Sequence, residues 1–120
     1  MILAVITTSP VWQAVNNQSH KHLKQLAEKL PALVMHEHAY STQKKYVQAF
    51  QRFQEWCEAM GVSYLPAAPE HVALYLVDIG LQAATAAPIE APSCAIKWAH
   101  RKACLAIPTE HALVSQTMKA

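Results

Sequence analysis

Glycine is scarce in this chain, with only 2 among its 120 residues. Tight β-hairpin turns and the loops that cradle phosphate groups in nucleotide-binding enzymes both depend on glycine, so an all-β fold and such a loop are disfavoured. Alanine, glutamine, lysine and leucine are plentiful instead, and these residues favour helix. The length suits one domain with a single core. We therefore expect an all-α domain.

Long apolar runs are also missing. No segment approaches the roughly 20 apolar residues that cross a bilayer. The short apolar run at residues 1–6 has no basic residue before it, unlike a secretory signal peptide. Cysteine is present in an odd number and without paired spacing, at Cys57, Cys94 and Cys104, which is typical of a reduced intracellular protein. We expect a soluble intracellular protein, nuclear if the host is eukaryotic, with no membrane partner.

Motifs for metal binding and catalysis are absent as well. The seven histidines include two pairs at i, i+2, which diverge on a helix, whereas zinc-binding pairs on a helix prefer i, i+4. In the stretch that begins at His36, Tyr40 stands where the H-E-x-x-H zinc motif needs its second histidine. No C-x-x-C pair, nucleophile elbow or Walker loop occurs. The sequence predicts no metal site, no cofactor, no small-molecule substrate and no catalytic residue, and hence no enzyme.

Apolar residues at helical spacing predict five helices. The first covers about 20–35, with Ser19 as its cap and Pro31 inside it, and the second covers about 41–60 and ends at Gly61. The expected limits of the other three are Pro69 to Gly80, Pro92 or Ser93 to Cys104, and a short helix from Pro108. Residues 1–17 show no helical period, and we expect them to form an extension outside the core.

The second predicted helix carries a polar row on the face opposite its apolar side. Lys45, Gln48 and Arg52 follow one another at i, i+3 and i+7. Lysine and arginine neutralise DNA phosphates, and arginine and glutamine can read base edges. The net charge is only +2, which permits nucleic-acid binding without requiring it. Taken alone, three polar residues on an exposed helix face are usually just solvated, and the same holds for Lys97 and Arg101 on the fourth helix.

The order of residues along the chain resembles the core-binding domain of the tyrosine recombinases, also called phage integrases. The residues that carry the resemblance are Ser41, Thr42, Tyr46, Phe53, Trp56, Cys57, Gly61, Leu65, Pro66, Ala67, Val72, Tyr75 and Leu76. The closing stretches at 95–100, 108–109 and 113–114 are similar to the last helices of that domain. The order of residues at 96–100 is similar to that in copies of this domain in animal genomes, which derive from mobile elements.

The resemblance implies an orthogonal bundle of four to five helices over residues 18–120, sometimes called SAM-like. In the family this domain forms half of a clamp around duplex DNA and approaches it with its second and fourth helices. Carried over to this chain, the DNA-binding residues would be Ser41, Thr42, Lys44, Lys45, Gln48, Arg52, Lys97, His100 and Arg101.

The family's catalytic domain, with its tyrosine nucleophile, has no counterpart in this sequence. The resemblance therefore implies a non-catalytic DNA-binding module that acts in DNA integration or recombination. Its partners would be duplex DNA and either a catalytic recombinase domain or other recombinase protomers.

The chain departs from the family pattern before its fourth helix. The family opens this helix with Ser-Thr-Ile and basic residues, whereas residues 87–92 contain Glu90 and two prolines. This change removes phosphate contacts, so a helical protein-interaction module or a transposon remnant that no longer binds DNA is the alternative. The DNA hypothesis requires Lys45, Arg52, Lys97 and Arg101 to share one face.

Overall fold

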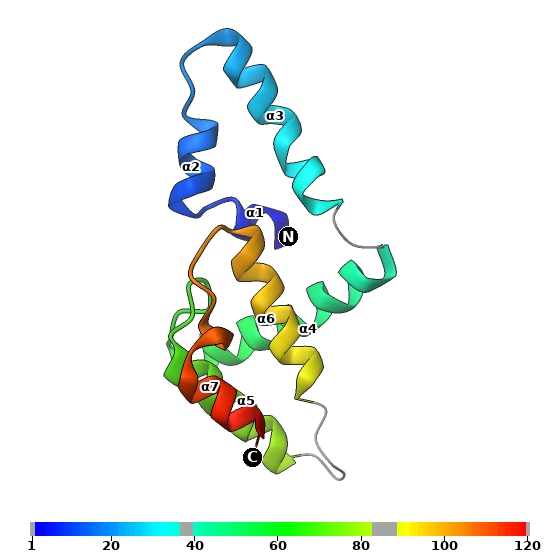
Figure 1. Cartoon of the computed structure of the whole chain (residues 1–120), viewed down its shortest axis with the longest axis vertical. Helices are drawn as coiled ribbons and strands as arrows, with labels where there is room; N and C mark the ends of the chain where they lie inside the picture. The colour runs from blue at the N-terminus through cyan, green and yellow to red at the C-terminus, as the bar shows by residue number, and fades with distance from the viewer. Residues whose placement is uncertain (1, 37–39, 83–88, 120) are drawn as a thin grey trace.

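The computed structural model describes residues 2–36, 40–82 and 89–119, which form an all-α fold (Figure 1). The expected fold class is thereby confirmed. The helices are α1 (Ile2–Ile6), α2 (Pro10–Asn16), α3 (Lys21–Met35), α4 (Tyr40–Met60), α5 (Pro69–Gln82), α6 (Glu90–Lys102), the 3-10 helix η1 (Pro108–Glu110) and α7 (Ala112–Lys119). Within these residues, β-pairing is limited to one isolated bridge between Tyr64 and Ala67. None of the described helices is long and apolar enough to cross a membrane.

The five predicted helices correspond to α3–α7, with corrections at several of their ends. Helix α6 ends at Lys102 rather than Cys104, and the last helix begins at Ala112, because residues from Pro108 form the separate 3-10 helix η1. The cap of α3 is His20 rather than Ser19, because the His20 ring accepts a hydrogen bond from the backbone N–H of His22. Helix α5 continues through Gly80 to Gln82. Helix α6 begins at Glu90, so Pro92 lies in its first turn, where a missing N–H has no partner to lose. Of the atypical stretch 87–92, residues 87 and 88 lie outside the described residues.

Helix α4 ends as its sequence predicts. Gly61 adopts a φ of 73°, a left-handed conformation that favours glycine. The Val62 N–H donates to the Cys57 carbonyl at 3.0 Å, and the Gly61 N–H donates to the Glu58 carbonyl at 3.3 Å. This pair of bonds satisfies two carbonyls of the last turn. At the other end, α4 begins at Tyr40, so Ser41 and Thr42 lie within its first turn.

The core lies where α4 meets α5 and α6. Phe50 and Phe53 of α4 are fully buried, together with Ile96 and Ala99 of α6. Phe53 also packs edge-on against Tyr75 of α5, with ring centroids 4.9 Å apart. Burial of aromatic side chains from a helix that is otherwise polar is the main stabilising contribution of α4.

The N-terminal residues belong to the core, so the prediction that 1–17 lie outside it is wrong. Ile6 and Trp12 are buried at 0% and 3% exposure. The Ser9 hydroxyl donates to the Ala103 carbonyl, and the Trp12 indole N–H donates to the Lys102 carbonyl, both at 2.6 Å. Carbonyls in the last turn of a helix have no partner within it. Helices α1 and α2 therefore form a cap over the C-terminal end of α6, which local periodicity could not reveal.

Candidate nucleic-acid interface

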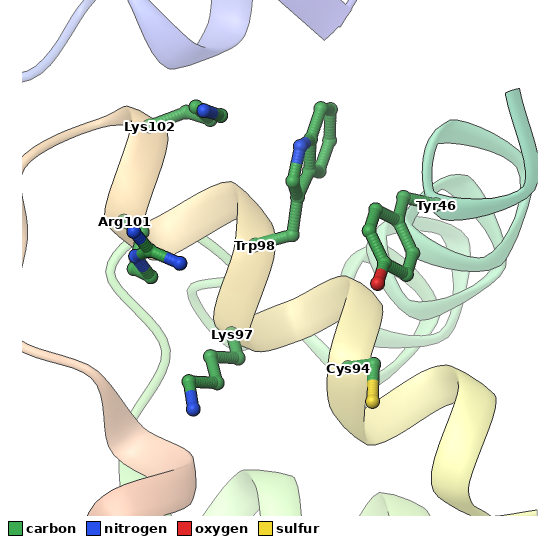
Figure 2. A pocket seen from close by; sticks show the side chains of 6 residues that line it. All are labelled: Tyr46, Cys94, Lys97, Trp98, Arg101 and Lys102. Atoms are coloured by element: carbon green, nitrogen blue, oxygen red, sulfur yellow. The ribbon is translucent and has the colours of Figure 1, made fainter. Parts of the chain in front are cut away.

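A hollow of about 200 Å³ lies along α6, where Tyr46 of α4 closes one side (Figure 2). Its lining residues are Tyr46, Cys94, Lys97, Trp98, Arg101 and Lys102. The residues from α6 follow at spacings of three and four, which place them on one face of the helix. Helix periodicity thus brings three basic side chains to a single surface.

The hollow is electropositive. Among the described residues that line it, the charged side chains are all basic. Lys97 and Arg101 are exposed to solvent, whereas Lys102 is 3% exposed. The Lys102 ammonium donates to the Val34 carbonyl at 2.9 Å, which compensates part of the cost of burying a charge. Lys102 therefore connects the end of α3 to α6.

Trp98 forms the wall between α6 and α4. Its ring lies 5.8 Å from the Tyr46 ring and is almost fully buried. Figure 2 shows it standing between Lys102 and Tyr46. No described residue accepts a hydrogen bond from the buried indole N–H of Trp98. An unsatisfied buried donor costs about 1–3 kcal/mol, which offsets part of the stability that burial of the Trp98 ring contributes.

The predicted DNA-binding residues are not gathered in one place. Lys97 and Arg101 line the hollow on α6, while Lys44 and Gln48 line a second hollow beside Met35. The remaining predicted residues on α4 line neither of these hollows: Ser41, Thr42, Lys45 and Arg52. Of the four residues that the DNA hypothesis requires on one face, Lys97 and Arg101 share a hollow, whereas Lys45 and Arg52 do not line it.

Arg52 lies in a different electrostatic environment. Burial raises the pKa of the Tyr75 phenol, and the positive charge of Arg52 partly lowers it again. The negative charges of Asp78 and Glu55 raise the same pKa. Arg52 therefore shares its neighbourhood with two negative charges, which weaken its attraction for a phosphate.

His100 is buried, so the prediction that it faces outward to DNA is wrong. The backbone N–H of Ala67 donates to its Nε2 at 2.9 Å, which leaves the proton on Nδ1, and Nδ1 donates to the Ile96 carbonyl at 2.7 Å. Burial lowers the pKa of His100, although the bond to Ile96 acts in the opposite direction. The neutral ring thus joins α6 to the loop before α5. Its spacing of four from Ile96 and three from Ala103, both inward-facing, was the signal that could have placed it.

Four residues of the hollow were missed as site residues by sequence reasoning: Tyr46, Cys94, Trp98 and Lys102. Trp98 lies four residues before Lys102, and both share the α6 face that bears Cys94 and Arg101. This spacing was available in the sequence. What it could not show is that Tyr46 of α4 would close the hollow from the side.

The buried thiol of Cys57 is poorly suited to act as a nucleophile. Burial, together with the nearby Glu58 charge, raises the pKa of the Cys57 thiol to about 11, which disfavours the reactive thiolate. In the described part of the chain, no three metal-ligating side chains form a group. Residues 37–39, within the stretch that was compared with a zinc motif, lie outside the described residues.

The chain was compared with known proteins in three ways. No family model matches it, and no curated protein or solved structure matches it either.

Proposed function

We propose that this chain binds duplex DNA without cleaving it, through the hollow on α6 and the adjoining first half of α4. The observation that carries the proposal is the placement of Lys97 and Arg101 at a hollow whose described charged lining is entirely basic. Such a site attracts phosphate oxygens and gains free energy by releasing the counterions of DNA.

The charges of α4 extend this surface. Lys44 and Lys45 are exposed in its first half, whereas Glu55 and Glu58 are exposed in its second half. The first half is the part that reaches α6, because Tyr46 packs against Trp98. Lys44 and Lys45 thus lie in the half of α4 that contains Tyr46, whereas Glu55 and Glu58 lie in the other half together with Arg52.

The more specific form of the proposal is a core-binding module of a tyrosine recombinase. Its support is the ordered residue pattern and the all-α fold with the expected order of helices. In this form the module binds DNA during integration or recombination. This would take place in the nucleus if the host is eukaryotic. A catalytic domain or other recombinase protomers would then perform the cleavage.

The proposal is tested by fluorescence anisotropy with a labelled random duplex of about 20 base pairs, titrated with salt. For each neutralised phosphate the slope of log K against log salt is about −0.9. The double variant Lys97→Ala/Arg101→Ala should therefore make the slope shallower by about 2 and weaken binding at low salt.

A matched control removes the same charge elsewhere. Lys21→Ala/Lys119→Ala changes two exposed lysines that do not line the hollow. Its slope should stay close to that of the parent chain. Equal losses in both variants would show that only net charge matters, and no binding by the folded chain at about 50 mM salt would refute the proposal.

A further inference from the structure

The hollow on α6 has two chemically different sides. Tyr46 and Trp98 form an aromatic wall, in which the Tyr46 ring is only half-buried. Figure 2 shows Lys97 and Arg101 on one side of the hollow and Tyr46 on the other. Most of the surface that lines the hollow is apolar, although its charged side chains are basic. An aromatic wall opposite two cations is complementary to the two parts of a nucleotide, a flat base and a phosphate.

A fully paired duplex uses only the basic side of this hollow. It presents phosphates and the edges of its bases, whereas the faces of its bases are stacked on one another. The aromatic wall would therefore stay in contact with water. An unpaired nucleotide also presents the face of its base, and it enters a pocket without the cost of breaking a base pair. The apolar part of the hollow thus favours an unpaired nucleotide.

The size of the hollow favours a base with a single ring. Its volume is about 200 Å³. Pockets for drug-sized ligands begin at about 300 Å³, and an apolar cavity of about 150 Å³ accepts a benzene ring. A pyrimidine has one ring with small substituents, whereas a purine has two fused rings. The hollow is therefore better suited to a pyrimidine.

We propose that the hollow binds one unpaired pyrimidine nucleotide of a DNA strand, with the base against Tyr46 and its flanking phosphates at Lys97 and Arg101. This inference rests on the proposed DNA binding and adds a preference for DNA that contains an unpaired pyrimidine. The two cations are four positions apart on α6, so their Cβ atoms lie about 5–6 Å apart and their side chains reach the same stretch of backbone. The base binds where α4 meets α6.

The test uses fluorescence anisotropy with four labelled duplexes of the same sequence at low salt. One is fully paired, and each of the others carries a single bulged nucleotide, which is thymidine, adenosine or abasic. The thymine bulge should bind about tenfold more tightly than the paired duplex, a gain in the range expected when one base stacks on an aromatic side chain. The abasic bulge interrupts the duplex in the same way but offers no base, so it should bind like the paired duplex. The adenine bulge should gain less than the thymine bulge.

Two exposed cysteines provide a matched pair of variants. Cys94 lines the hollow, and Cys104 does not. Cys94→Leu places a larger apolar side chain in the hollow, so it should abolish the preference for the thymine bulge. Cys104→Leu makes the same change elsewhere and should keep the preference. The readout is the ratio of the dissociation constants for the two duplexes, which a smaller folded fraction would leave unchanged.

Several results would contradict the inference. Equal binding of the thymine bulge and the paired duplex would overturn it and leave the proposed duplex binding intact. An abasic bulge that gains as much as the thymine bulge would assign the gain to deformability of the DNA. An adenine bulge that gains more would assign it to stacking on an open surface, and either result would overturn insertion into the hollow. If the folded chain bound none of the duplexes, the proposed function and the inference would fail together.

Discussion

Trp12→Ala is expected to lower the free energy of unfolding by about 3–5 kcal/mol, the usual cost of removing a buried tryptophan. The side chain is 3% exposed, and its indole N–H donates to the Lys102 carbonyl at 2.6 Å. The substitution therefore leaves a cavity and an unsatisfied carbonyl at the end of α6. Typical domains are stable by about 5–15 kcal/mol, so the loss should be evident in urea denaturation followed by circular dichroism.

Two neighbouring substitutions separate the contributions. Trp12→Phe keeps most of the apolar burial but removes the donor, so it should cost about 1–2 kcal/mol. Val11→Ala changes a side chain that is 47% exposed and should cost less than about 0.5 kcal/mol. If Trp12→Ala were as stable as Val11→Ala, α2 would not dock on α6 as the structure has it.

Acidification from pH 7 toward pH 5 is expected to destabilise the protein through His100. Burial lowers the pKa of this ring below its ordinary value of 6.5. Between the two pKa values the unfolded chain binds a proton that the folded chain does not, so stability is complete above pH 6.5 and falls as the pH drops below it. The fall is at most about 1.4 kcal/mol per pH unit for one proton.

Replacement of His100 should flatten this pH dependence. His100→Phe does not titrate, but it leaves the Ala67 N–H without its acceptor and should cost about 1–3 kcal/mol at pH 8. His22→Gln changes an exposed histidine of α3 and should keep the pH dependence of the parent chain. The measurement is the urea midpoint of each variant between pH 5 and 8. A His100→Phe variant with an unchanged pH dependence would assign the effect to another group.

Much of the fold could be predicted because its signals are local. The aromatic face of α4 follows a helical period, and Gly61 takes the left-handed conformation that ends the helix. Helix boundaries were less predictable where a residue is compatible with positions both inside and outside a helix. Gly80 can end a helix or continue it, and Pro92 is tolerated in a first turn as well as before it.

The candidate site was only partly predictable, because it depends on which helices become neighbours. Helical spacing alone places Lys97 and Arg101 on one face of α6. The same spacing places His100 with Ile96 on the inward side, although its polar neighbour Arg101 suggested the opposite.

The sequence by itself determined the helical class, the five helices from α3 to α7 and the basic face of α6, since these depend on residues a few positions apart. Only the tertiary structure decided that Tyr46 closes the hollow on α6. The same is true of the contact between Trp12 and the C-terminal end of α6. The tertiary structure also decided that the leucines of α3 stay exposed. Contacts between residues some 90 positions apart, such as Trp12 with Lys102, arise from packing and from hydrogen bonding of helix-end carbonyls, and neither leaves a periodic trace in the sequence.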